Sequence, residues 1–363
     1  MAAELRTLGF LHLGRAESGV RRYGQLIADE ARTREGVEII EVEAGRVDES
    51  SAQLARVAAE LADRDVVIMQ WNRRGWGKHG RSLPRLMRFR RAFRGALVVT
   101  LHDVFDREGL RQRHLQPDVW SLRWLGRTAD RIVVHSQIEV ERLRGIVPMD
   151  KIRVIPHFVE RRQLTLTPEE ARAKLGLSGR RVVTLLGFVY GRKGHRYAVE
   201  AVPFMPDDAV MVYAGGPVAG RSFVHDLALS KAEELGLGDR FRITGYLDDD
   251  AWETWIAATH LAILPFTDLS ASGSLSSWIS AGKPMLVSDL PGLREYGRRV
   301  PGALHFFGPP EPWPLGSAIS ELLAQPLPDP DPNVLRLARE LSMERTVDRY
   351  LQVAREALAA RRR

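Results

Sequence analysis

Short runs of Val, Ile and Leu, separated by stretches long enough for a helix, are the feature that most restricts how this chain folds. One series of runs lies at residues 7–13, 65–70, 96–101, 131–135 and 152–155. A second series lies at residues 181–189, 209–214, 241–244, 260–266, 284–288 and 303–307. Apolar residues that follow one another, instead of alternating with polar ones, are typical of parallel strands covered by helices on both faces. The sequence therefore predicts an α/β protein with two doubly wound, Rossmann-like parallel sheets.

The length of 363 residues also fits two domains, each with its own core. Residues 160–177 separate the two series of runs, and Thr167, Pro168 and Glu170 form a helix-start pattern there. We therefore predict an N-terminal domain at residues 1–162 and a C-terminal domain at residues 163–333. A linker rich in Pro and Asp at residues 326–332 precedes a helical pattern at residues 334–363. Periodicity alone would pack this last segment on the second domain.

The absence of cysteine excludes disulfides, thiolate nucleophiles and Cys-ligated zinc, and it agrees with a reducing compartment. No apolar run approaches the ~20 residues that span a bilayer. Residues 1–14 also lack the cationic start and the small-residue cleavage site of a secretory signal. We therefore expect a cytoplasmic protein, and we expect no nucleic acid among its partners.

The formal net charge is +7, and much of the basic excess lies in residues 73–94, where it is interleaved with Trp76, Leu86 and Phe89. A solvated amphipathic helix is the favoured interpretation of this stretch. The alternative is peripheral contact with the inner face of a membrane, because basic groups and apolar anchors reinforce each other at an anionic surface.

Ligands of open parallel sheets bind beyond the carboxyl ends of the strands, so the turns that follow the predicted strands are the candidate sites. The turn at residues 13–20 contains Gly14 and Gly19 and enters a helix, where exposed N–H groups attract anions. It lacks the full G-x-G-x-x-G spacing, and a plain tight turn is an equal alternative. His102 follows the strand at 96–101 and is suited to contact substrate oxygens or move a proton, although a lone histidine is more often structural.

Two turns of the second half suit a diphosphate better. In residues 187–195, Arg192 and Lys193 stand together between glycines, and the alternative there is a solvated basic turn. Residues 267–275 crowd hydroxyls and small residues at the start of a helix, which favours an anion site at the helix N-terminus. The acidic run at residues 248–250 is interpreted as a helix cap, not a metal site. The sequence has no HExxH, Walker or Gly-x-Ser-x-Gly pattern.

Taken in order, several segments resemble the GT-B glycosyltransferases of the large retaining family 4. These segments are residues 129–136 (ADRIVVHS), 151–158 (KIRVIPHF), 192–195 (RKGH), 213–216 (YAGG) and 281–284 (AGKP), followed by Glu295. The resemblance implies two Rossmann-like domains facing across a cleft, with the donor nucleotide on the second and the acceptor on the first. It also implies that the C-terminal helix crosses back to the first domain.

Carried over residue by residue, the resemblance assigns His102 to the transferred sugar and Lys193, with Arg192, to the donor phosphates. The donor-binding residues that it implies are Gly19, Gly187, Gly245, Tyr246, Leu247, Ser272, Gly273, Ser274, Ser277 and Glu295. The donor would be a UDP- or GDP-sugar. The acceptor would be a glycan, a lipid-linked molecule or a small metabolite. The expected chemistry is retaining and needs no cofactor or metal, since the leaving phosphate itself helps to deprotonate the acceptor hydroxyl.

The sequence departs from the family pattern at three positions. Phe188 stands where the family usually has an arginine, and Leu269 and Ser277 stand where it has two glutamates. Arg192 is expected to replace the missing cation, and the Ser277 hydroxyl to meet the ribose. Two alternatives are kept beside the transferase. One is a non-catalytic subunit that binds a nucleotide sugar or glycan, and the other is a nucleotide-sugar epimerase of the same fold.

Overall fold

The computed structural model describes residues 4–13, 19–44, 51–71, 82–102, 104, 117–160, 163–189, 191–217, 222–268 and 272–361. The chain divides into two compact units, each described here by itself. Unit 1 comprises Met1–His157 and Met343–Arg363, and unit 2 comprises Phe158–Ser342. The boundary between the two units along the chain therefore falls after His157, whereas the sequence predicted it at residue 162. The predicted C-terminal segment 334–363 is divided between them.

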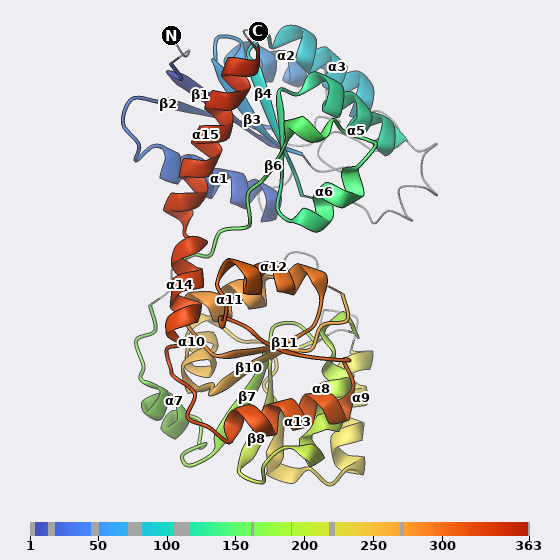
Figure 1. Cartoon of the computed structure of the whole chain (residues 1–363), viewed down its shortest axis with the longest axis vertical. Coiled ribbons are helices and arrows are strands. Elements are labelled where there is room, and N and C mark those ends of the chain that lie inside the picture. The colour runs from blue at the N-terminus through green and yellow to red at the C-terminus, as the bar shows by residue number, and fades with distance from the viewer. Residues whose placement is uncertain are drawn as a thin grey trace. The chain divides into compact units, whose positions relative to one another are not determined.

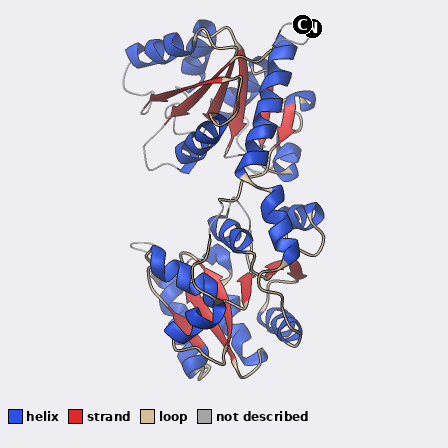
Figure 2. Ribbon diagram, turned by 90° about the vertical axis from the view of Figure 1, so that its left-hand side faces the viewer, coloured by secondary structure: helices blue, strands red, loops and turns tan. Residues whose placement is uncertain are grey.

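Unit 1 is a six-stranded parallel sheet in the order β2-β1-β3-β4-β5-β6, with helices on both faces (Figures 1 and 2). Its strands are β1 (Thr7–Leu13), β2 (Glu38–Ala44), β3 (Val66–Trp71), β4 (Ala96–Leu101), β5 (Arg131–Val134) and β6 (Ile152–Val154). Its helices are α1 (Gly19–Ala31), α2 (Ser51–Leu61), α3 (Ser82–Ala92), α5 (Pro117–Thr128), α6 (Gln137–Leu143) and α15 (Met343–Arg361).

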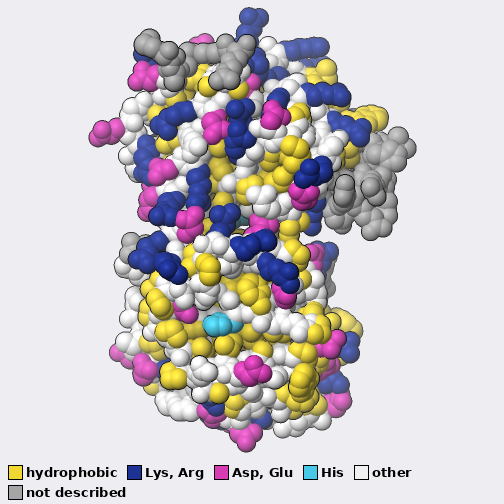
Figure 3. All heavy atoms as spheres, in the orientation of Figure 1, with side chains coloured by type: hydrophobic (Ala, Val, Ile, Leu, Met, Phe, Trp, Pro, Cys, Tyr) yellow, Lys and Arg dark blue, Asp and Glu magenta, His cyan; other side chains and the backbone are white. Residues whose placement is uncertain are grey.

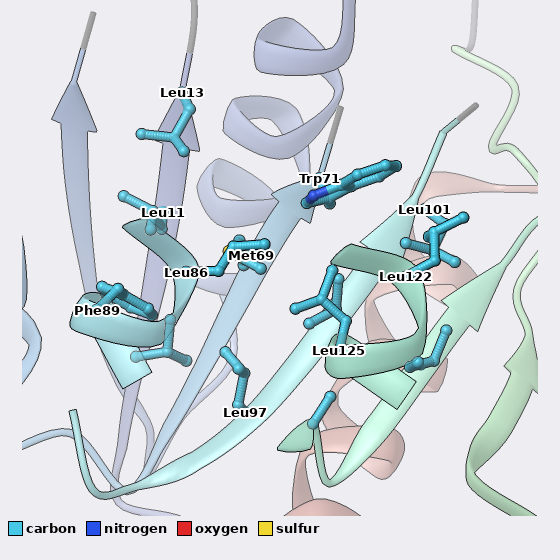
Figure 4. Close-up of a cluster of buried hydrophobic side chains, with 14 of the residues drawn as sticks. Leu11, Leu13, Met69, Trp71, Leu86, Phe89, Leu97, Leu101, Leu122 and Leu125 are labelled. Carbon is cyan, nitrogen blue, oxygen red and sulfur yellow. The ribbon is translucent and has the colours of Figure 1, made fainter. Parts of the chain in front are cut away.

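The main core of unit 1 lies between this sheet and the helices α2, α3 and α5. Figure 4 shows side chains of β1, β3 and β4 packed against those of α3 and α5, with the Trp71 ring at one end. The apolar residues of the basic stretch belong to this core, because Leu86 and Phe89 are each only 1% exposed. The described part of that stretch is therefore an amphipathic helix whose apolar face is already covered. Trp76 lies outside the described residues.

Helix α15 packs beside α1 on the opposite face of the same sheet (Figure 1). The Tyr350 hydroxyl lies 3.1 Å from Thr100 Oγ1 on β4 and 3.4 Å from the Tyr23 hydroxyl on α1. Glu356 also accepts from Arg153 Nε at 2.7 Å. These contacts attach the last helix of the chain to the first unit.

Unit 2 repeats the architecture with a parallel sheet in the order β12-β11-β10-β7-β8-β9. Its strands are β7 (Arg181–Leu186), β8 (Ala209–Ala214), β9 (Phe241–Ile243), β10 (Leu261–Leu264), β11 (Met285–Ser288) and β12 (His305–Phe307). Its helices are α7 (Pro168–Lys174), α8 (His195–Ala201), α9 (Phe223–Glu234), α10 (Asp249–Ala258), α11 (Gly273–Ala281), α12 (Pro291–Arg299), α13 (Pro312–Leu323) and α14 (Pro332–Glu340).

The predicted α/β class with two parallel sheets is confirmed. The predicted caps are confirmed as well: Thr167 and Glu170 form a capping box, and the Asp248 carboxylate accepts from Ala251 N at 2.8 Å. The helical pattern at 334–363 is not one helix. It is interrupted at Leu341 and Ser342, so that α14 packs against α11 and α12 of unit 2 and only α15 belongs to unit 1.

Lys and Arg side chains are spread over the face shown in Figure 3, with acidic and hydrophobic side chains between them. Among the described residues, no helix combines the length and the apolar character needed to cross a bilayer.

Candidate active site

The order in which strands are added to the sheet of unit 2 reverses between β7 and β10. Strands β8 and β9 follow β7 on one side, whereas β10, β11 and β12 extend the sheet on the other. At such a switch point the turns after the two central strands diverge, and the space beyond their carboxyl ends is the usual ligand site of doubly wound sheets. The described parts of these two turns fall in residues 187–194 and 265–272, which overlap the segments 187–195 and 267–275 that the sequence singled out.

Lys193 lies in the first of these turns, at the end of the short 3-10 helix Gly191–Lys193. Its ammonium donates to Leu186 O at 2.8 Å, which holds the side chain over the end of β7. A Cβ on Gly187 would lie 2.4 Å from Lys193 Nζ, so only glycine leaves room for the ammonium in this position. Gly187 also has φ +99°, a conformation that side chains disfavour.

Burial lowers the pKa of Lys193 to about 8. Burial removes hydration from the ammonium, which destabilises the charged form and lowers its pKa. A phosphate anion beside it would restore that stabilisation. The electrostatics of this lysine therefore suit an anionic ligand.

The two turns are joined to each other. Thr267 N donates to Arg192 O at 3.1 Å, and a Cβ on Gly194 would lie 1.9 Å from Pro265 O. Gly194 is thus required for the close approach of the two chain segments. The predicted basic turn and the predicted serine-rich turn form one edge of unit 2.

Arg192 differs from Lys193 in its surroundings. Its guanidinium pairs with Asp268 at 3.2 Å, and its side chain is 73% exposed. An exposed pair of this kind contributes ~0–1 kcal/mol. Arg192 is consequently available to exchange Asp268 for another anion at little cost.

Helix α11 begins at Gly273 in the second turn, as predicted. Ser272 caps the helix by accepting from Leu275 N at 3.3 Å, and its hydroxyl lies 3.1 Å from that of Ser274. Apart from its chain neighbours and the backbone of its own helix, no described atom lies within 4 Å of the position of a Cβ on Gly273. Exposed N–H groups and the positive end of the helix dipole make this a suitable anion-binding terminus. Leu269 lies outside the described residues.

Two further predicted donor-binding residues lie on helices α11 and α12. Ser277 lies on α11, one turn into the helix, and its hydroxyl donates to Gly273 O at 2.9 Å. With its proton used in this way, the Ser277 hydroxyl has only acceptor lone pairs left. Glu295 is buried on α12, with 8% of its surface exposed.

The turn after β9 carries three of the predicted donor-binding residues. Gly245 has φ +77°, Tyr246 is 82% exposed, and Leu247 packs against the core of unit 2. Phe188, at the end of β7, is 50% exposed. Two aromatic rings thus stand in solvent on the turns that follow β7 and β9.

In unit 1, Gly19 opens α1 and no described atom lies within 4 Å of its Cβ position. The rest of its turn, residues 14–18, lies outside the described residues, as does Asp103. His102 follows β4, and its Nε2 lies 2.7 Å from Gln70 Oε1 at the end of β3.

Sequence reasoning missed the group to which His102 belongs. His135 follows β5 and His157 lies three residues after β6, so consecutive neighbouring strands of the sheet each lead to a histidine. The ring centroids of His102 and His135 are 4.9 Å apart, and those of His135 and His157 are 3.9 Å apart. The signal was present in the sequence as V-V-T-L-H, I-V-V-H and R-V-I-P-H, each a strand followed by His.

Lys283, in the motif AGKP, has a structural role that the sequence did not reveal. Its ammonium is buried and donates to Asp329 at 2.6 Å, to Ala257 O at 2.9 Å and to Thr259 O at 3.1 Å. It ties the loop before β11 to the end of α10 and to the segment that precedes α14.

The N-terminal and C-terminal halves of the chain each match a family of known proteins. Residues 43–163 match the family described as Glycosyltransferase Family 4, and residues 180–325 match the family described as Glycosyl transferases group 1. A 2-deoxystreptamine glucosyltransferase of Streptomyces kanamyceticus is 27% identical over 187 residues, which is 49% of this chain and 46% of that protein. The alignment thus spans about half the length of that relative.

Solved structures with similar folds cover nearly the whole chain. HepE from Anabaena in complex with UDP superposes with a TM-score of 0.75 at 16% identity, over 96% of this chain and 99% of that one. A glycosyltransferase from Rickettsia africae gives 0.70 at 14% identity, covering 98% and 99%. Sucrose-phosphate synthase from Thermosynechococcus elongatus gives 0.67 at 16% identity, covering 98% and 100%.

The two parallel α/β units, the basic turn at the switch point and these matches define a glycosyltransferase. The chain belongs to the GT-B glycosyltransferases of the family 4, group 1 type.

Proposed function

We propose that the chain transfers a hexosyl unit, with retention, from a UDP- or GDP-sugar to a hydroxyl group of a glycan, a lipid-linked molecule or a small metabolite. The observation that carries the proposal is the ammonium of Lys193, held by Leu186 O above Gly187 at the switch point of unit 2. Both the family and the ligand of the HepE structure, UDP, support a nucleotide-sugar donor.

In the proposed reaction the bond between the anomeric carbon and the diphosphate breaks, and negative charge grows on the departing phosphate. Lys193 neutralises that charge, and Arg192 adds a second cation after leaving Asp268. The first N–H groups of α11 contribute fixed dipoles that need no rearrangement during the step. Electrostatic stabilisation of the leaving group is therefore the main catalytic term.

The acceptor hydroxyl forms the new bond to the same face of the sugar, and its proton passes to the leaving phosphate. No protein carboxylate is required for this step, and we propose that no metal or cofactor takes part in it. His102 orients the transferred sugar through a hydrogen bond. Ser277 accepts from a ribose hydroxyl in place of the glutamate of the family.

The test is turnover of a panel of donors. The protein is incubated with UDP-glucose, UDP-galactose, GDP-mannose and related donors, with and without candidate acceptors, and released UDP or GDP is measured. Acceptor-dependent release that is lost in Lys193→Ala and kept in Lys231→Ala supports the transferase. Nucleotide binding without release supports a non-catalytic subunit, and an altered sugar still on its nucleotide supports an epimerase.

A further inference from the structure

We infer that His102, His135 and His157 form a binding site for a divalent transition-metal ion of the zinc type in unit 1. The ligating nitrogens of the three side chains all lie within 4.8 Å of one another. Strands β4, β5 and β6 are neighbours in the sheet, so their carboxyl ends bring the three imidazoles to one edge.

The hydrogen bond made by one ring nitrogen of His135 leaves its other ring nitrogen with a lone pair that a metal could accept. Its Nδ1 lies 2.9 Å from Ile155 O. A carbonyl can only accept, so in the neutral ring Nδ1 carries the proton and Nε2 carries the lone pair. Within the described part of the chain, that Nε2 is buried and has no hydrogen-bond partner. A buried acceptor without a partner is costly in a folded protein, and a bound ion would remove the cost.

His102 is held in a comparable way. Its Nε2 meets Gln70 Oε1 at 2.7 Å, which leaves Nδ1 as the nitrogen with a lone pair. Histidine ligands of metals usually give their second ring nitrogen to a carbonyl or carboxylate, which fixes the tautomer and the ring orientation. Ile155 O and Gln70 Oε1 supply such partners to two of the three rings.

The three imidazoles are also in the protonation state that binds metals. Burial lowers the pKa of all three side chains, that of His135 to about 4. Burial therefore favours the neutral imidazole, which is the form that binds a metal ion.

The three nitrogen ligands determine which kind of metal ion the site suits. Three imidazole nitrogens suit zinc, cobalt or nickel, whereas magnesium and calcium require oxygen ligands. A tetrahedral zinc with bonds of about 2.0–2.1 Å places its nitrogens roughly 3.3 Å apart, so the rings must draw together slightly on binding. The fourth position remains for a water molecule or an oxygen of a ligand.

Tyr23 on α1 contacts all three histidines. Its ring packs edgewise against those of His102, His135 and His157, with centroids 5.0, 5.3 and 4.9 Å away. Its hydroxyl lies 3.4 Å from that of Tyr350 on α15. The last helix of the chain thereby helps to keep the histidines in place.

A bound ion would occupy Nδ1 of His102, the ring nitrogen that would otherwise accept a hydrogen bond from the transferred sugar. Zinc would then compete with the transferred sugar and inhibit the enzyme. This consequence rests on the proposed function, whereas the metal site itself does not.

The experiment measures metal binding directly. The full chain, without a histidine affinity tag, is stripped with EDTA, dialysed, and titrated with Co²⁺ and with Zn²⁺. We expect one ion per chain by elemental analysis, with intense visible absorption from tetrahedral Co²⁺ that Zn²⁺ abolishes. His135→Ala and His157→Ala should each weaken binding by more than about 100-fold, since even outer partners of metal ligands are worth roughly 10–100-fold.

His225→Ala is the matched control, because His225 lies on α9 of unit 2, outside the cluster. It should bind Co²⁺ as the wild type does. His135→Gln, which retains a polar side chain of similar length, gives a second test if His135→Ala does not fold. Wild-type protein that takes up no Co²⁺, or a folded cluster variant that takes up as much as the wild type, overturns the inference. Binding measured this way does not depend on whether any sugar is transferred.

Discussion

The ammonium of Lys193 occupies the space in which a side chain on Gly187 would begin. A Cβ at Gly187 would lie 2.4 Å from Lys193 Nζ. The glycine after β7 and the lysine at the end of the following 3-10 helix are therefore sterically interdependent. The glycine allows the charge to lie directly beyond the strand, where a diphosphate would be bound.

Replacement of Gly187 by alanine should displace that charge. Gly187→Ala is expected to weaken binding of UDP or GDP by at least about 10-fold, because a charge-assisted hydrogen bond is worth roughly 1.5–3 kcal/mol. Isothermal titration calorimetry measures the effect. Gly191→Ala in the same turn is the control, since no described atom lies within 4 Å of its Cβ position. Equal losses in both variants would mean that the whole turn is disturbed and that the steric relationship is not the cause.

The lowered pKa of Lys193, about 8, predicts a pH dependence of donor binding. Lysine is charged below its pKa, so kcat/KM for the donor should fall as pH rises through 8, by up to about tenfold per unit. Lys193→Arg remains charged throughout this range and should lose this dependence, which also corrects for titration of the nucleotide. A variant with arginine that keeps the wild-type profile would remove Lys193 as its origin.

Ser277 should contribute modestly to binding. Ser277→Ala removes one acceptor for a ribose hydroxyl, which corresponds to about 0.5–1.5 kcal/mol, or roughly 2–10-fold in the Kd of UDP or GDP. Ser276→Ala on the same helix is the control and should leave the Kd unchanged. A loss of 100-fold or more would mean that Ser277 has a larger role than one hydrogen bond.

Lys283 should matter for stability and not for nucleotide contact. Lys283→Ala leaves Asp329 and two carbonyl oxygens without their partner, and it should lower the free energy of unfolding by about 3 kcal/mol. Lys231→Ala breaks the exposed pair with Glu234 and should cost less than about 1 kcal/mol. Urea denaturation compares them, and similar midpoints would contradict the structural role of Lys283.

Buried strands were the part of the fold that sequence could predict. Their apolar runs are continuous because both faces of the sheets are covered, and the strands end within a few residues of the expected positions. Strand β2 was missed because Glu38, Glu41 and Glu43 interrupt its apolar pattern at the sheet edge. The C-terminal segment was read as one helix because its periodicity continues across Leu341 and Ser342.

The candidate site was predictable only where its chemistry lies in a continuous segment. Residues 187–195 and 267–275 reveal their cations, glycines and hydroxyls locally. The histidine cluster does not, since its members are joined only by the order of β4, β5 and β6 in the sheet. The structural role of Lys283 was equally hidden, because its partners come from α10 and from the loop before α14.

The central claim is that the Lys193 turn of unit 2 receives the donor diphosphate, and calorimetric titration of UDP and GDP into Lys193→Ala tests it most directly. Binding should be about 10–100-fold weaker than in the wild type, with Lys231→Ala unchanged. If Lys193→Ala binds the preferred nucleotide as tightly as the wild type does, the diphosphate is not bound there and the account is wrong.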